Sequence, residues 1–213
     1  MLGFYNYTVI LTYLGLASSI FGITQVIEVY KGHGNYSIAF LCLLISGLCD
    51  LFDGKIARMK KNRTDREKVF GIQIDSLCDL ICFGVFPAIL GYSFGMNYGL
   101  GLASAIAIVL AAVIRLGYFN TVEQERQSQT QEKRHDYRGL PVTSVAIILP
   151  IIYIAGGGLL GRTFPFVFQI CLIVISALFL IKFRVKKPQI FGVLLLLLIG
   201  VLILIGFFQG RLR

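Results

Sequence analysis

The sequence predicts an all-α, polytopic integral membrane protein, a helical bundle with about 6–8 transmembrane helices. Of the 213 residues, 56% are hydrophobic and only 15% are charged, whereas about a quarter of the residues of a soluble domain are charged. The mean hydropathy is +0.79, and the apolar residues form runs of roughly 20, the length that an α-helix needs to cross a bilayer. No linker is long enough to divide the chain, so we expect residues 1–213 to form a single domain.

The hydropathy along the chain divides it into candidate spans separated by charged or glycine-containing stretches. The spans cover about residues 7–30, 36–54, 75–94, 97–118, 141–160, 164–182 and 189–208. We expect the second span to continue as a helix beyond the bilayer, through Arg58. The last span is rich in leucine and isoleucine, and no internal repeat is evident.

Lysine and arginine are concentrated in three loops that would share one side of the membrane. Loops 55–68, 119–140 and 182–188 contain Lys55, Arg58, Lys60, Lys61, Arg63, Arg66, Lys68, Arg126, Lys133, Arg134, Arg138, Lys182, Arg184, Lys186 and Lys187. The opposite side has only Lys31, Arg162, Arg211 and Arg213. Because cytoplasmic loops carry an excess of basic residues, we expect the N-terminus and these loops on the cytoplasmic side of the cell membrane. The net charge of +9 then comes from basic residues that set the membrane topology and lie near anionic lipid. We therefore expect no nucleic-acid partner.

Four aspartates lie at the predicted cytoplasmic ends of the second and third spans. Asp50 and Asp53 are three positions apart, and Asp75 and Asp79 are four apart. On helices, each pair shares one face, about a turn apart. Two such pairs on consecutive antiparallel helices could converge on one polar pocket. Burying four negative charges without a counter-ion would be prohibitive, so the sequence predicts a site for a hard divalent cation.

These residues resemble the defining motif of the CDP-alcohol phosphotransferases, integral membrane enzymes of phospholipid synthesis. The pattern D-x-x-D-G-x-x-A-R followed by G-x-x-x-D-x-x-x-D is complete at Asp50, Asp53, Gly54, Ala57, Arg58, Gly71, Asp75 and Asp79. The motif core is therefore residues 50–79. The stretches 70–79, 83–88, 115–120 and 138–141 are similar to the bacterial phosphatidylserine synthase branch of the family.

Two features depart from the family pattern. Twelve residues separate Arg58 from Gly71, where the common pattern has eight. The four extra residues amount to about one helical turn, so a longer cytoplasmic projection would leave the register intact. Tyr118 stands where this branch would have a second arginine, which weakens the assignment of serine as the acceptor.

The resemblance implies that an alcohol hydroxyl attacks the lipid-side phosphorus of CDP-diacylglycerol and that CMP is released. It assigns one or two Mg²⁺ or Mn²⁺ ions to the four aspartates, and it makes Asp79 the general base. It assigns CDP binding to the motif residues, which are Asp50, Asp53, Gly54, Ala57, Arg58, Gly71 and Asp75. A homodimer is also a family expectation.

The branch implies L-serine as the acceptor and serine O-phosphatidyl transfer as the reaction. A serine carboxylate favours a nearby arginine, so Arg115 and Arg138 are the candidates, with Asn120 as a polar partner. Taken alone, Arg115 could instead snorkel toward the membrane surface.

Two alternatives stay open. A sister enzyme of the family would use glycerol 3-phosphate or an inositol phosphate, which should demand more cationic residues around the pocket than this chain offers. A cation transporter would use the aspartates as an ion site. Transport predicts acidic residues spread over several spans, whereas spans four to seven contain no Asp or Glu.

Overall fold

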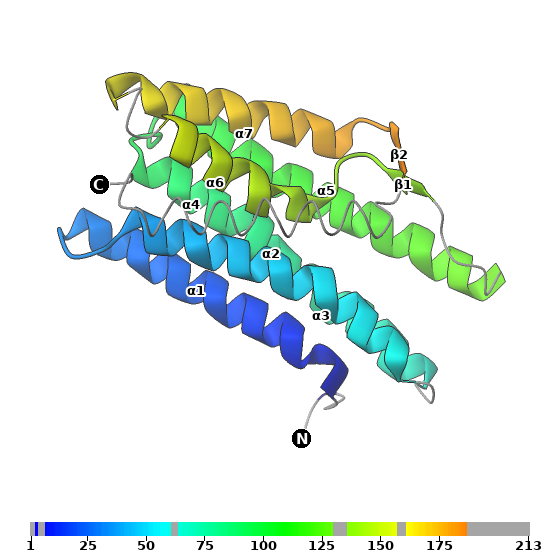
Figure 1. Ribbon diagram of the computed structural model, residues 1–213. Helices are drawn as coiled ribbons and strands as arrows, with labels where there is room; N and C mark the ends of the chain where they lie inside the picture. Colours follow the sequence, from blue (N-terminus) through cyan, green and yellow to red (C-terminus); the bar gives the residue numbers. More distant parts are fainter. Residues whose placement is uncertain (1–2, 4–6, 61–63, 130–135, 157–160, 187–213) are drawn as a thin grey trace.

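The computed structural model describes residue 3 and residues 7–60, 64–129, 136–156 and 161–186. These residues form a bundle of helices that lie side by side, with one short strand pair at one end of the bundle (Figure 1). In chain order the elements are η1 (Tyr7–Val9), α1 (Ile10–Tyr30), α2 (Tyr36–Met59), α3 (Asp65–Asp79), η2 (Leu80–Val85), α4 (Phe86–Ser93), α5 (Gly99–Gln129), β1 (Asp136–Arg138), η3 (Val142–Ser144), α6 (Val145–Gly156), η4 (Gly161–Thr163), α7 (Phe164–Leu180) and β2 (Arg184–Lys186).

The described part of the chain contains five helices that are long and apolar enough to cross a membrane. They are Ile10–Tyr30, Tyr36–Gly54, Asp65–Ser93, Gly99–Glu125 and Gly161–Leu180. A sixth apolar helix, Val142–Gly156, is shorter. These helices confirm the predicted polytopic helical membrane bundle, whereas the predicted span 189–208 lies outside the described residues.

Helix α2 confirms the expectation that the second span continues past Arg58. Its N-terminus is capped by the Asn35 side chain, which accepts a hydrogen bond from the Ser37 amide at 2.7 Å. The helix ends at Met59, so Asp50 and Asp53 lie on regular helix in its last three turns.

The third span begins earlier than the hydropathy indicated, at Asp65 instead of residue 75. Thr64 and Glu67 form a capping box, in which each side chain binds the backbone N–H of the other. Lys60 and Glu67 form an ion pair at 2.8 Å across the turn between α2 and α3. Hydropathy alone does not mark residues 65–74 as part of a span, because they are polar. The capping box nevertheless starts the helix at Asp65. The part of the basic stretch from Asp65 onward is therefore helical.

Helices α3 and α4 are joined without a break by the π-helical turn η2. In that turn the Phe86 amide binds the Ile81 carbonyl, five residues back. Pro87 follows directly and has no N–H to donate to the carbonyl four residues before it. The wider turn therefore lies where a regular α-helix would be interrupted.

Helix α5 continues to Gln129, eleven residues beyond the expected end of the fourth span at residue 118. Hydropathy falls after residue 118, but residues 118–129 contain no glycine or proline to stop the helix. The helix therefore projects from the bundle, as Figure 1 shows.

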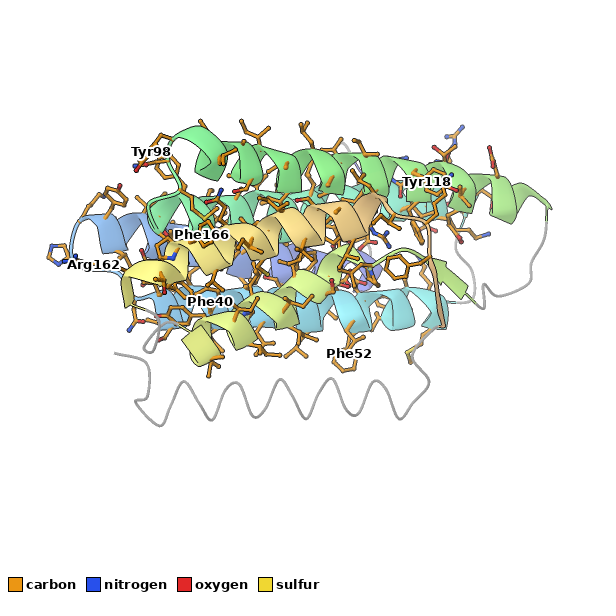
Figure 2. All side chains as sticks on the ribbon, turned by 90° about the horizontal axis from the view of Figure 1, so that it is seen from above. Phe40, Phe52, Tyr98, Tyr118, Arg162 and Phe166 are labelled. Carbon is orange, nitrogen blue, oxygen red and sulfur yellow. The ribbon has the colours of Figure 1, made fainter. Side chains whose placement is uncertain are left out.

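Two three-residue strands, which the sequence analysis did not predict, connect two of the basic loops. Strand β1 pairs antiparallel with β2, so that Arg138 faces Arg184 in the register. Gly139 follows with φ +75°, a conformation that favours glycine, and its amide binds the Phe183 carbonyl at 2.7 Å. The strand pair, the α2–α3 turn and the end of α5 all lie at the same end of the bundle (Figure 1). Figure 2 shows Tyr118 toward this end, with Tyr98 and Arg162 at the other.

Candidate active site

Three of the four motif aspartates meet between α2 and α3, two to four helical turns in from the connection that joins the two helices. The carboxylate oxygens of Asp50, Asp75 and Asp79 lie within 4.8 Å of one another. Asp79 is the last residue of α3 and is only 9% exposed. The two helices are consecutive and antiparallel, so the pairs spaced at three and four positions converge as the sequence analysis expected.

Asp53 joins the same group from the next turn of α2. Its side chain is 6% exposed. It faces Asp75, while Asp50 faces Asp79. One of its oxygens, Oδ2, accepts a hydrogen bond from the Thr12 hydroxyl at 2.8 Å. Thr12 belongs to α1, so a third helix contributes to the site. We call Asp50, Asp53, Asp75 and Asp79 the aspartate cluster.

The aspartate cluster concentrates negative charge in an apolar bundle. Two unit charges about 4 Å apart repel by about 4 kcal/mol at the effective dielectric constant typical of a protein surface. The ion pairs found in the described residues involve Glu28, Asp65 and Glu67, and none of them reaches the cluster. A cation supplied from outside would offset this repulsion.

The donor set fits a hard divalent cation. All the ligand atoms are carboxylate oxygens, which hard cations prefer. Neighbouring oxygens around a small octahedral ion are about 3.0 Å apart and opposite ones about 4.2 Å apart, so three oxygens within 4.8 Å of one another would close in on a bound ion. The structure therefore supports the prediction of a cation site in this cluster.

The π-helical turn η2 begins directly after Asp79. Such turns occur often at functional sites, because they re-aim the side chains next to them. Cys82 and Phe83 of this turn are buried, and Gly84 packs closely on α5, where an added Cβ would lie 3.2 Å from the Ala112 Cβ. The end of α3 is therefore held firmly against α5.

The remaining motif residues lie on the same two helices as the aspartates. Gly54 is exposed, and an added Cβ would meet no atom within 4 Å. Ala57 is half-buried in the last turns of α2, and Gly71 lies half-buried on α3. Arg58 continues α2, and its side chain lies outside the described part of the structure. The open space at Gly54 is compatible with the predicted approach of a nucleotide.

Asn120, a predicted acceptor residue, contacts α3 near the aspartate cluster in sequence. The Ser76 hydroxyl donates to Asn120 Oδ1 at 2.9 Å, and Ser76 follows Asp75 directly on α3. The contact joins α5 to α3 one residue after a motif aspartate.

Arg115 points to a different side of α5. It lies five positions before Asn120, which is a rotation of about 140° on a helix. Its guanidinium donates to the carbonyls of Phe179 at 3.3 Å and Gly139 at 3.4 Å. Arg138 precedes Gly139 and belongs to β1. Arg115 thus contacts the residue that follows Arg138, and it lines a cavity of about 140 Å³ between α5 and α7.

The sequence analysis did not identify Thr12 and Ser76 as parts of the site. Each is a single polar residue in or beside an apolar span, and such residues usually bond to their own helix backbone. Only the packing of α1 and α5 against the motif helices shows that these two hydroxyls reach across to other helices.

Comparison with known proteins places these residues in a family context. The model of the CDP-alcohol phosphatidyltransferase family matches residues 5–199. A CDP-diacylglycerol–serine O-phosphatidyltransferase of Saccharomyces cerevisiae is 32% identical over 126 residues, which cover 58% of this chain and 44% of that protein. A Helicobacter pylori protein of the same name is 32% identical over 119 residues, or 54% of this chain and 46% of the relative.

An archaeal relative carries a different name. The archaetidylserine synthase of Methanothermobacter thermautotrophicus is 34% identical over 124 residues, which cover 58% of this chain and 49% of that protein. The chain thus spans about half the length of the curated relatives that it matches. No solved structure matches it.

Proposed function

This chain belongs to the CDP-alcohol phosphatidyltransferase family, and we propose that it is a CDP-diacylglycerol–serine O-phosphatidyltransferase. In this reaction the serine hydroxyl attacks the phosphorus that carries the diacylglycerol, the bond to CMP breaks, and phosphatidylserine and CMP result. The proposal treats residues 1–213 as one domain with its motif core at 50–79. The observation that carries it is the convergence of Asp50, Asp75 and Asp79 within 4.8 Å, between helices that present the complete motif.

We assign Mg²⁺ or Mn²⁺, as one or two ions, to the aspartate cluster. Both ions prefer oxygen ligands, and all four side chains supply them. When bound, such an ion draws charge from the phosphate oxygens and holds the reacting groups in line. The chain's own part is to keep four carboxylates together at the membrane edge, which it does by anchoring Asp53 to α1 and Asp79 to the rigid α3–η2 junction.

Asp79 is proposed as the general base. An alcohol is a poor nucleophile unless its proton is removed as it attacks, and a carboxylate within hydrogen-bond reach can take that proton. Asp79 is the last of the four aspartates in the sequence, and it is only 9% exposed. The proton would therefore move to a carboxylate that water reaches poorly. Asp50 faces it and would share the charge.

The nucleotide would lie over the face that carries Gly54, Ala57 and Gly71. Their small side chains leave room for a close approach to the helix backbones. Arg58 is the proposed partner of a phosphate. The open space around Gly54 supports this assignment.

L-Serine is the proposed acceptor, because the names of the yeast, Helicobacter and archaeal relatives all contain serine. The archaeal name differs from the other two in its lipid part. Asn120 is an acceptor candidate because it bonds to Ser76, the residue that follows Asp75 on α3. Arg115 and Arg138 stay candidates for the serine carboxylate. A homodimer stays a prediction of the family resemblance.

We propose that the aspartate cluster faces the cytoplasm, at the end of the bundle where the α2–α3 turn and the strand pair lie (Figure 1). Most of the lysine and arginine residues belong to loops at this end, and basic loops are retained in the cytoplasm. Water-soluble serine and CMP would then enter and leave from the cytoplasm, while the diacylglycerol stays in the bilayer.

The direct test measures CMP release from CDP-diacylglycerol by the purified protein with Mg²⁺ or Mn²⁺. L-Serine, glycerol 3-phosphate and inositol phosphate would be compared as acceptors. We expect release that depends on serine and on the metal. CMP release with another alcohol but not with serine would assign the chain to a sister activity. If none of the alcohols supported CMP release, the proposed transfer would be contradicted.

A further inference from the structure

Thr12 makes an interhelical contact that its position does not require. A threonine in a helix usually donates its hydroxyl to a carbonyl of the preceding turn, and for Thr12, the third residue of α1, that turn is supplied by η1. Thr24, on the same helix α1, does this: its hydroxyl donates to the Phe21 carbonyl at 2.7 Å. Thr12 donates instead to Asp53 Oδ2 at 2.8 Å, across 41 positions of sequence.

The contact constrains the one carboxylate of the aspartate cluster that lies outside the group of three. The second side-chain torsion of an aspartate is broad, so its carboxylate turns easily when nothing holds it. Asp53 also faces Asp75 and has the Gly54 amide as a neighbour on its own helix. The Thr12 hydrogen bond adds a contact from a different helix and fixes the position of Oδ2.

The close packing of α1 on α2 makes this contact possible. Gly22 of α1 approaches α2 so closely that an added Cβ would lie 2.8 Å from the Cys42 Cβ. The Ser19 and Ser46 hydroxyls are 2.8 Å apart, buried between the same two helices. At Thr12, two turns closer to the cytoplasmic end, the same packing brings a hydroxyl to a motif carboxylate.

We infer that Thr12 is a positioning residue for the cation site: its hydroxyl holds Asp53 in the orientation that the ion requires. The inference rests on the proposed metal-dependent function and adds to it a residue from α1, outside the motif. A hydrogen bond from a neighbouring residue to a metal-binding side chain orients that side chain, and its loss typically costs about 10–100-fold in metal affinity or activity.

The test measures Mn²⁺ binding to the purified protein in detergent, without substrate, from the electron paramagnetic resonance signal of the free ion. Thr12→Val keeps the shape of the side chain and removes the hydroxyl. We expect it to raise the Mn²⁺ dissociation constant by about 10-fold. Thr12→Ser keeps the hydroxyl, and we expect it to bind Mn²⁺ nearly as the wild type does.

Ser19→Ala is the matched control, because it removes a hydroxyl contact between the same helices away from the cluster. We expect it to lower the unfolding temperature and to leave Mn²⁺ binding unchanged. In an Asp53→Asn background, Thr12→Val should have no further effect, since the two residues would act as a unit. In activity assays, Thr12→Val should raise the metal concentration needed for half-maximal rate more than it lowers kcat.

The possible results separate the inference from the function on which it rests. If the wild type binds Mn²⁺ and Thr12→Val binds it equally well, the role of Thr12 is overturned while the metal-dependent function stands. Equal losses in Thr12→Val and Ser19→Ala would also overturn it, because loosened helix packing would then be the cause. No Mn²⁺ binding by the wild type would overturn the metal-dependent function, and the inference with it.

Discussion

The two ends of the bundle are built on opposite principles, and helix α2 contributes to both. Near its start, Phe40 stacks on Tyr153 at 4.3 Å, and Phe94 packs edge-on against Phe164 and Phe168 at 5.0 and 5.1 Å. Near its end, Asp50 joins Asp75 and Asp79. The aromatic end is stabilised by the contacts that the chain makes with itself, whereas the aspartate end brings like charges together.

This contrast indicates which end needs a partner from outside the chain. Aromatic rings at these distances attract one another, so that end is complete without a ligand. The aspartate cluster is costly as the chain alone presents it, and a cation and a phosphate-bearing substrate would offset that cost. Stability should therefore depend on the aromatic end and activity on the aspartate end, which can be tested by substitution.

The largest expected effect is on activity. Asp79→Asn removes the proposed base and one cation ligand while keeping the size of the side chain. We expect CMP release to fall by about 10²–10⁴-fold, the usual contribution of a general base. Because the change also removes a repelling charge, the unfolding temperature without metal should not fall.

The control for this experiment is Asp65→Asn on the same helix. The Asp65 side chain is 95% exposed, and among the described residues its ion-pair partner is Lys68, three positions later. It should leave CMP release unchanged. Full activity in Asp79→Asn would remove Asp79 from the mechanism and weaken the contrast between the two ends.

The second prediction concerns the cation. Mg²⁺ or Mn²⁺ at 100 times its dissociation constant should stabilise the wild type by about 2.7 kcal/mol, measured as a rise in unfolding temperature, and EDTA should abolish both this rise and CMP release. Asp50→Asn should lose most of the rise. A metal-induced rise that persists in Asp50→Asn would place the ion elsewhere in the molecule.

The third prediction concerns the aromatic end. Phe168 is fully buried, and Phe168→Ala should lower the free energy of unfolding by about 2 kcal/mol, since lipid replaces part of the hydrophobic transfer term and mainly packing is lost. Mn²⁺ affinity should stay the same. Phe166→Ala, a change at a side chain that is 64% exposed on the same helix (Figure 2), should have little effect. A large change in Mn²⁺ affinity in Phe168→Ala would show that the two ends are coupled.

The smallest expected effect concerns Arg115, a cation satisfied by the chain itself. Its bonds to the Phe179 and Gly139 carbonyls tie α5 to the end of α7 and to the turn after β1. Arg115→Met should lower the free energy of unfolding by about 1.5 kcal/mol. It should also raise the KM for serine more than that for CDP-diacylglycerol, as an acceptor residue would. Unchanged stability with a raised serine KM would make Arg115 an acceptor residue alone.

Much of this protein is determined by local sequence. The membrane class, five of the spans and the continuation of α2 past Arg58 follow from hydropathy and helix periodicity, which are properties of neighbouring residues. The spacing of Asp50 with Asp53, and of Asp75 with Asp79, likewise places each pair on one helix face without knowledge of the fold. The early start of α3 and the long end of α5 were missed because the hydropathy of a segment does not report whether its backbone is helical.

Only the tertiary structure decided which side chains meet across helices. Whether Thr12 bonds to its own backbone or to Asp53, and whether Asn120 reaches Ser76, depends on how closely the helices pack and how they are rotated. The pairing of β1 with β2 joins segments almost fifty residues apart. Such contacts depend on the arrangement of the whole bundle, because helix packing is set by many small side-chain contacts at once and not by the residues that finally touch.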